Sequence, residues 1–271
     1  MPSPDPRLAS ARLHADVDRL RAQAALSWPR EARALAQAGL HDGATVLEGG
    51  CGPGIITEHL LEALPQARLT ALDLDPEMCE LARDRLGGRF DGRLEIVQSS
   101  ILFTQLPSNS FDFALARFVF QHLSAPDLAL AEILRLLRPG GRLAILDVDD
   151  DLGGLVVPRL PAFEVLGRRV RERQAREAGD RQIGRKLWRL LASAGFVEVD
   201  LSAVVFHSDE LGLEPFRAQF DPRRYRAFLG SGGLTPEEWH AYQAAVSQLF
   251  AAPDAFILQL VLLASGAKPM R

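Results

Sequence analysis

The chain has 271 residues, of which 47% are hydrophobic and 24% charged, and this ordinary globular usage excludes a chain that is disordered as a whole. The formal net charge of −4 gives no general attraction to nucleic acid or to anionic membranes, and two cysteines are too few for a disulfide scaffold. Since no apolar run is long enough to cross a membrane and no secretory signal is visible, we expect a cytoplasmic protein, a monomer or a homodimer, with no nucleic-acid or membrane partner.

The first 40 residues are predicted to form N-terminal helices. Apolar residues recur at helical spacing between positions 7 and 38. Pro29 is expected to separate two helices there, because the residue before a proline disfavours the helical conformation. Gly39 and Gly43 then end the segment.

From residue 44 onward, short apolar strands alternate with helices. The strands are almost continuously apolar, which is typical of a parallel sheet covered by helices on both faces. We therefore predict an α/β fold with a doubly wound sheet, formed by the whole chain (1–271) as a single domain. The predicted strands are residues 44–47, 68–73, 93–97, 111–116, 142–148, 196–206 and 256–264.

Two stretches, residues 151–181 and 208–254, do not follow this alternation and are predicted to be helical insertions. They come after the fifth and sixth predicted strands, and ligands of open α/β sheets bind beyond the carboxyl ends of the strands. We expect a helical lid over a substrate cavity, on a cofactor-binding core at 41–150, with surface decoration as the alternative. The arginine-rich run at 168–173 is interpreted as a solvated helix face, with contact to an acidic substrate as the alternative.

A glycine-rich loop, Gly50-Cys-Gly52-Pro-Gly54, follows the first predicted strand and opens a helix. Glycine lets the backbone turn sharply and lets a ligand approach the main chain. A dinucleotide-binding loop would need glycine where this chain has Ile55. The preceding Glu48 places negative charge beside the loop, which favours S-adenosylmethionine, with its sulfonium and ammonium groups, over a pyrophosphate.

Asp73 ends the second predicted strand. A carboxylate at such a position can accept two hydrogen bonds from a ribose diol. The loop and this acid together predict a nucleoside site.

At this point the sequence resembles the class I S-adenosylmethionine-dependent methyltransferases. The nucleotide loop of that family is similar to residues 46–54, and further segments follow in the family's order. The subgroup that it resembles most is that of small-molecule methyltransferases similar to those of quinone biosynthesis. The resemblance implies a Rossmann-like sheet of seven strands, mostly parallel and with an antiparallel last strand. The other matching segments are residues 71–78, 106–112, 120–123 and 134–141.

The resemblance also implies which residues bind the cofactor, S-adenosylmethionine. The acid and glycines of the loop would line its methionine end, Asp73 would bind the ribose, and Leu74 would flank the adenine. Where the family often has an acidic residue near the adenine amino group, this chain has Ser100. The implied cofactor-binding residues are Glu48, Gly50, Gly52, Gly54, Asp73, Leu74, Ser100, Ile101 and Arg117.

His122 is the first candidate for a general base, because it follows the fourth predicted strand at the expected edge of the cavity. His207, which ends the sixth predicted strand, is the second candidate. Clustered aspartates at 147–151 could hold Mg²⁺, but such sites usually also have a carboxylate where this chain has Arg117, so we predict no metal.

The predicted function is methyl transfer from S-adenosylmethionine to a small-molecule acceptor, a hydroxyl in the first place, by in-line displacement. One alternative is a non-catalytic module that binds the cofactor. A second is a methyltransferase that acts on a macromolecule, although Ala116-Arg-Phe-Val119 replaces the Asn/Asp-Pro-Pro-Tyr segment typical of base-methylating enzymes. A nicotinamide dehydrogenase is the alternative that the sequence favours least.

Overall fold

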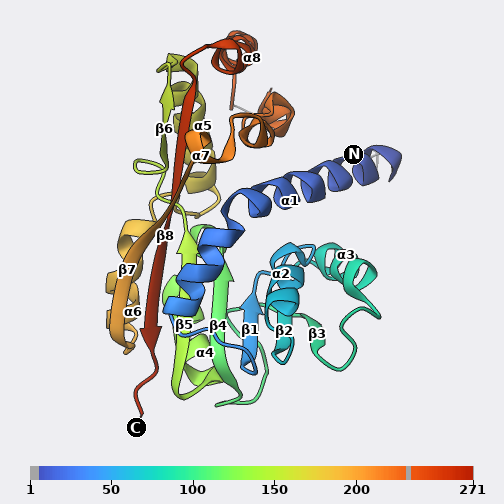
Figure 1. Ribbon diagram of the computed structural model, residues 1–271, viewed down its shortest axis with the longest axis vertical. Coiled ribbons are helices and arrows are strands. Elements are labelled where there is room, and N and C mark those ends of the chain that lie inside the picture. The colour runs from blue at the N-terminus through green and yellow to red at the C-terminus, as the bar shows by residue number, and fades with distance from the viewer. Residues whose placement is uncertain (1–5, 230–232, 271) are drawn as a thin grey trace.

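The structure, a computed structural model, describes residues 6–229 and 233–270 and is built around one mixed sheet (Figure 1). Its strands are β1 (Thr45–Gly49), β2 (Arg68–Asp73), β3 (Leu94–Gln98), β4 (Phe111–Arg117), β5 (Leu137–Asp147), β6 (Gly154–Val157), β7 (Val197–His207) and β8 (Phe256–Ala267). The strand order is β3-β2-β1-β4-β5-β8-β6, with β7 also paired to β8. Strands β1 to β5 run parallel, whereas β8 is antiparallel to each of its neighbours. The predicted α/β fold with an antiparallel last strand is confirmed.

The sheet has eight strands rather than the seven predicted, and the additional strand is β6. It lies within 151–181, which was expected to be a helical insertion without a strand. Strand β8 explains the difference, because its residues 262–267 pair with β5 while its residues 256–259 extend beyond β5 and pair with β6. Four residues are too few for a strand period to be recognised in sequence, and here the partner strand determines the conformation.

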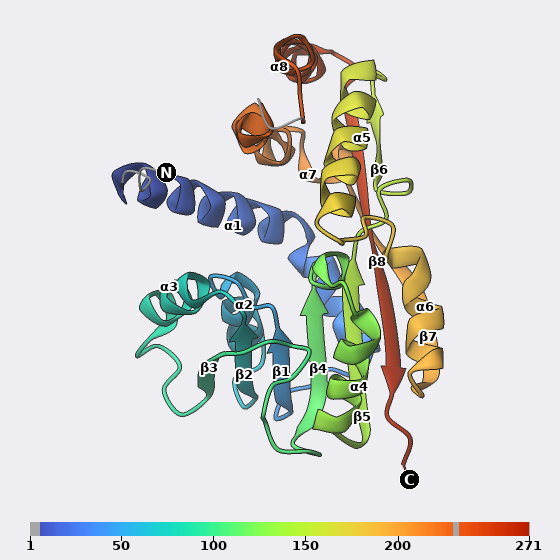
Figure 2. The same ribbon diagram turned by 180° about the vertical axis from the view of Figure 1, so that it is seen from behind.

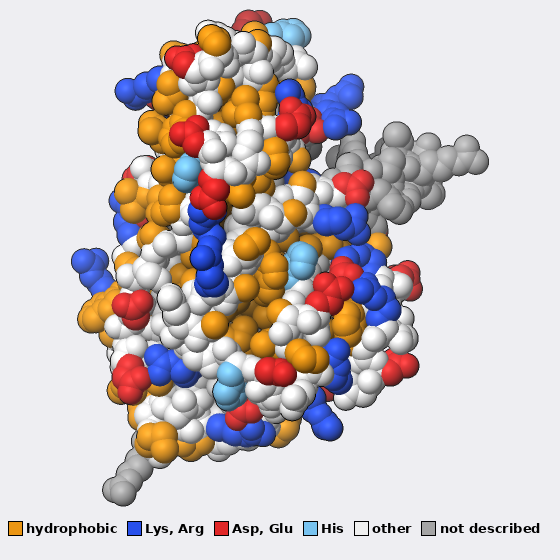
Figure 3. All heavy atoms as spheres, viewed as in Figure 1, with side chains coloured by type: hydrophobic (Ala, Val, Ile, Leu, Met, Phe, Trp, Pro, Cys, Tyr) orange, Lys and Arg blue, Asp and Glu red, His pale blue; other side chains and the backbone are white. Residues whose placement is uncertain are grey.

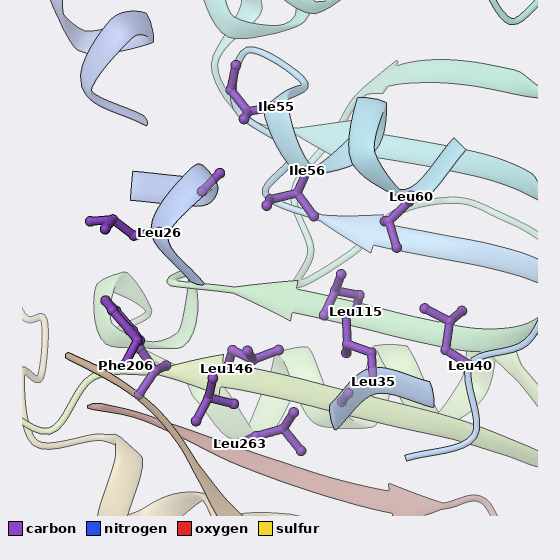
Figure 4. Packing of buried hydrophobic residues seen from close by; sticks show 14 of the residues in the cluster. Leu26, Leu35, Leu40, Ile55, Ile56, Leu60, Leu115, Leu146, Phe206 and Leu263 are labelled. Atoms are coloured by element: carbon purple, nitrogen blue, oxygen red, sulfur yellow. The ribbon is translucent and has the colours of Figure 1, made fainter. Parts of the chain in front are cut away.

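Helices cover both faces of the sheet (Figures 1 and 2). They are α1 (Pro6–Gln37), α2 (Ile55–Ala63), α3 (Pro76–Leu86), α4 (Pro126–Leu136), α5 (Pro161–Arg176), α6 (Leu187–Ser193), α7 (Ser208–Leu211) and α8 (Pro236–Ala251), with 3₁₀ helices η1 (Phe120–His122), η2 (Gly184–Lys186), η3 (Glu214–Gln219) and η4 (Pro222–Phe228). One hydrophobic cluster joins α1 and α2 to the sheet, and a second joins α4 and α6 to its other face. In Figure 4, Leu35 and Leu60 lie close to Leu115 of β4.

Pro29 lies inside the single helix α1 instead of separating two helices. Tertiary packing overrides the local preference, since Leu26 and Leu35 on either side of the proline are buried in the core. Trp28 also stacks on His59 of α2, with ring centroids 5.2 Å apart. Figure 1 shows that α1 changes direction along its length, as helices containing proline do.

The segments that were expected to form a lid, and that keep this name below, contain α5, η3, η4, α8 and β6. They extend the molecule beyond the carboxyl ends of the parallel strands (Figures 1 and 2). Leu166, Leu234, Tyr242 and Val246 form a small core within the lid. Two helical patterns were expected within 208–254. The second, 236–251, is α8, but the first is divided into η3 and η4, because the proline at 222 cannot continue a helix from 221.

Candidate functional site

The loop between β1 and α2 depends on three glycines with backbone in the left-handed region. The φ angles of Gly50, Gly52 and Gly54 are 72°, 54° and 75°. A Cβ on Gly50 would lie 2.3 Å from Val119, and one on Gly54 would lie 2.7 Å from Leu86. A Cβ on Gly52 would meet nothing within 4 Å, so the main chain there faces open space that a ligand could fill.

Asp73, at the carboxyl end of β2, lies directly beside this loop. Its Oδ2 accepts a hydrogen bond from the Gly52 amide at 2.8 Å, and its Oδ1 accepts one from the Asp75 amide at 3.0 Å. Each carboxylate oxygen has a second lone pair, so the side chain could also accept ribose hydroxyls. The next residue, Leu74, is 69% exposed and leaves apolar surface uncovered next to this carboxylate.

Glu48 is buried in β1 immediately before the loop. Its Oε2 accepts a hydrogen bond from the Thr57 hydroxyl at 2.6 Å. Burial raises the pKa of Glu48 to about 7, against the opposing effects of the Thr57 hydrogen bond and the Arg117 charge. A cationic group placed here would favour the ionised carboxylate, so the residue suits an ammonium or sulfonium ligand.

Arg117, at the end of β4, is bound to α1. Its Nε and Nη2 donate to both carboxylate oxygens of Glu31 at 2.7 and 2.9 Å, and Nη2 also donates to the Ser27 hydroxyl at 3.3 Å. The guanidinium lies over the ring of Phe118, 4.3 Å from its centroid. Sequence reasoning missed Glu31, because nothing local relates it to a residue 86 positions later.

Ser100 and Ile101 follow β3 on the other side of the loop. The Ser100 hydroxyl accepts a hydrogen bond from the Leu102 amide at 3.2 Å. Ile101 is buried, and its Cδ1 would lie 2.4 Å from a Cβ on Gly49. The structure thus gathers the predicted cofactor residues from β1, β2, β3 and β4 at one edge of the sheet.

His122 lies at the end of η1 and is linked to other polar groups. Its Nδ1 lies 3.5 Å from Nε2 of Gln174, which donates to the backbone carbonyl of Gln121 at 2.8 Å. Arg181 in turn donates to Oε1 of Gln121 at 2.8 Å. Desolvation and the positive charge of Arg181 lower the pKa of His122, although the residue is exposed, and this favours a neutral ring at neutral pH.

His207 lies at the junction of β7 and α7. Its Nε2 is 3.7 Å from the carboxylate of Glu210, which also pairs with Arg30 of α1. Its buried Nδ1 has no hydrogen-bond partner in the described part of the chain. The ring packs on Phe256 with centroids 5.9 Å apart.

The aspartates that follow β5 are engaged with protein groups. Asp147 accepts hydrogen bonds from two backbone amides, and burial raises its pKa to about 7. Asp149 pairs with Arg185, and Asp150 pairs with Arg181 through two hydrogen bonds of 2.7 and 2.9 Å. Within residues 6–229 and 233–270, no group of three or more His, Cys, Asp or Glu side chains is arranged to hold a metal ion.

A cavity of about 320 Å³ lies between the sheet edge and the lid. Ser27, Phe118 and Val148 border it on the side of the core, and Phe163, Tyr225 and Tyr242 are among the lid residues that border it opposite. These six residues come from α1, the ends of β4 and β5, and the lid helices. Phe118 has a φ of 57°, which is uncommon for a bulky residue and typical of strained backbone at a ligand site. Neither His122 nor His207 belongs to the cavity lining.

The sheet order, the glycine loop after β1 and the acid that ends β2 together resemble the nucleoside-binding α/β domains of the class I methyltransferase type. Residues 47–145 match the family model described as a methyltransferase domain. Over this segment the chain is similar to the class I S-adenosylmethionine-dependent methyltransferases.

Two curated relatives each match 41% of the chain. Trans-aconitate 2-methyltransferase of Azoarcus sp. is 41% identical over 111 residues, which are 41% of this chain and 42% of that protein. The ubiquinone/menaquinone biosynthesis C-methyltransferase UbiE of Methylobacterium nodulans is 35% identical over 112 residues, 41% of this chain and 44% of the relative. The chain thus spans less than half the length of these relatives.

A solved structure extends the likeness to most of the fold. Phosphoethanolamine N-methyltransferase 2 of Haemonchus contortus, in complex with phosphomonomethylethanolamine and S-adenosylhomocysteine, superposes with a TM-score of 0.59. The sequences are 18% identical, over 89% of this chain and 53% of the other, so this likeness concerns the fold.

Proposed function

We propose that the protein transfers the methyl group of S-adenosylmethionine to an oxygen of a small organic acceptor bound under the lid. The observation that carries this proposal is the partly enclosed space of about 320 Å³ that begins at Phe118 and Val148, the residues that follow β4 and β5. The loop after β1 ends at the same edge of the sheet. A small molecule can therefore meet a nucleoside cofactor there.

The cofactor residues have separable roles in this proposal. The carboxylates of Glu48 and Asp73 bind the cationic methionine end and the ribose, while the open main chain at Gly52 lets the ligand approach closely. Leu74 offers its exposed side chain to the adenine. Arg117, paired with Glu31, attaches α1 over the methionine end.

The bound cofactor supplies an activated methyl carbon, so the protein mainly has to position the acceptor and exclude water. Aromatic side chains of the core and the lid, including Phe118, Phe163 and Phe220, form the walls of the cavity. Charge is dispersed during an in-line displacement at a sulfonium, which a dry apolar space favours. The acceptor proton remains to be removed when the nucleophile is a hydroxyl.

His122 is proposed as the group that receives this proton. Its lowered pKa keeps the ring neutral at neutral pH, and the hydrogen bonds of Gln174, Gln121 and Arg181 hold it next to the cavity wall. Because the ring does not line the cavity, the acceptor proton reaches it in this proposal through water. His207, at the lid junction, is the second candidate. His122→Gln should lower kcat for hydroxyl acceptors with little change in cofactor affinity. If kcat falls in His207→Gln and not in His122→Gln, the second histidine is favoured.

The test of the function uses the purified full chain, methyl-labelled S-adenosylmethionine and a panel of small hydroxyl, amine and carbon acceptors. Label in an oxygen-methylated product supports the proposal, and the absence of measurable cofactor binding would refute it. Tight cofactor binding without transfer to any acceptor would instead indicate a binding module.

A macromolecular acceptor is the remaining alternative. On the face shown in Figure 3, basic and acidic side chains are interspersed rather than gathered into a basic surface. Among the described residues, no helix has the length and apolarity needed to span a membrane. Steeply salt-dependent binding to RNA or DNA would favour this alternative.

A further inference from the structure

We propose that the cavity under the lid selects an acceptor that carries a carboxylate on an apolar body, and that Arg171 binds this carboxylate. The inference rests on the proposed function and names the chemical class of its substrate. The cavity wall carries an excess of positive charge, because it contains three arginines, Arg171, Arg181 and Arg224, and one acid, Asp150.

The three arginines differ in what already satisfies them. Arg181 is neutralised by Asp150, and Arg224 donates from Nη1 to the backbone carbonyl of Gln219 at 2.7 Å. Arg171, on α5, is partly buried and makes no hydrogen bond or ion pair with any residue that the structure describes. A partly buried guanidinium without a counter-ion is costly unless a ligand supplies the anion.

Gln219 gives a second, independent indication of a polar ligand. The residue is only 8% exposed and lines the same cavity, yet its buried Nε2 has no hydrogen-bond partner among the described residues. Buried amide groups in native proteins almost always have a partner. An unpaired donor and an unpaired cation in the wall of one cavity form an arrangement that a bound oxyanion would complete.

The rest of the wall describes the body of the ligand. Phe163, Phe220, Tyr225 and Tyr242 form a chain of ring contacts along one side, with centroids 5.4 to 6.0 Å apart in the pairs that involve them. Such walls suit an aromatic or aliphatic group. Because one of the three arginines in the cavity wall lacks a partner among the described residues, a monoanionic carboxylate matches the charge better than a doubly charged phosphate.

The experiment measures binding rather than turnover, so it does not require the natural acceptor. The full chain, saturated with S-adenosylhomocysteine, is titrated calorimetrically with benzoate and 3-phenylpropanoate, with the corresponding amides, and with phenyl phosphate. We expect the acids to bind about 10- to 100-fold more tightly than the amides, the usual effect of a hydrogen-bonded charge. In Arg171→Gln this preference should fall to about 1.

Variants on the same helix separate a binding role from a structural one. Arg168→Gln removes an exposed arginine of α5 and should leave the preference intact. Arg171→Lys keeps the charge and should restore part of the preference, which a merely structural loss would not do. Gln219→Leu should weaken the acids more than the amides.

Four results would overturn the inference: no binding of the acids, equal binding of the amides, an unchanged acid preference in Arg171→Gln, or tighter binding of phenyl phosphate than of benzoate. The last would assign the cavity to phosphates. Failure of the proposed function is distinguishable, because it would already appear as absent binding of S-adenosylhomocysteine in the first titration.

Discussion

Asp73 combines a structural and a binding role, since its carboxylate holds the glycine loop through the Gly52 amide and keeps lone pairs for a ligand. Asp73→Ala is expected to weaken S-adenosylhomocysteine binding by about 1–3 kcal/mol, the usual cost of losing a buried hydrogen-bonding partner. Calorimetric titration measures the effect, with the exposed Asp84→Ala as a control. An unchanged affinity would mean that the ribose binds elsewhere.

Glu48 links the charge of the site to the pH dependence of stability. Its pKa is about 7 in the folded protein, above the ordinary value of 4.5. The folded state therefore holds this proton more tightly than the unfolded chain, so the stability it contributes is present below about pH 4.5 and is lost as the pH rises toward 7.

Glu48→Gln removes this loss, because glutamine stays neutral. At pH 8 the free energy of unfolding should exceed that of the wild type by about 1–3 kcal/mol, whereas at pH 4.5 the two should be similar. Urea unfolding at both pH values tests this, and an equal difference at both would contradict it. The same variant should bind the cationic cofactor more weakly.

The helix α1 is joined to the sheet by a buried ion pair, Glu31 with Arg117, whose side chains are 1% and 8% exposed. Arg117→Met leaves the Glu31 carboxylate buried and unpaired, which should cost about 3–5 kcal/mol in unfolding free energy. The double variant with Glu31→Leu should recover most of this loss. Denaturant titrations of the single and double variants decide the matter, since purely additive losses would argue against coupling.

The elements that could be predicted from sequence are those whose pattern is long and local. The parallel strands and α8, with its Thr235 cap, are examples. Strand β6 and the continuation of α1 through Pro29 could not be predicted, because a neighbouring strand and a packed core decide them. The same holds for the site: the loop and Asp73 lie in contiguous motifs, whereas Glu31 and Gln219 meet their surroundings only in the folded chain.

The whole molecule should respond to its cofactor as a single cooperative unit, because β1 and α2, which flank the loop, share one hydrophobic cluster with α1 and the lid. S-adenosylhomocysteine at about 100 times its Kd should add about 2.7 kcal/mol of stability, which corresponds to a rise in Tm of roughly 5–10 °C at this size. Differential scanning fluorimetry measures the shift. NADH serves as the control, and a comparable rise with it would favour a dinucleotide site.

Strand β8 spans the core and the lid, with one end hydrogen-bonded to β5, the other to β6, and β7 running alongside. A continuous hydrogen-bonded ladder of this kind resists bending, so we expect no hinge motion that separates the core from the lid. Entry and departure of small molecules then depend on movements of the 3₁₀ turns and of α8, which no ladder fastens to the sheet. Substitutions that stiffen the 3₁₀ turns should slow the binding and release of small molecules and should leave strand β8 and the glycine loop unchanged.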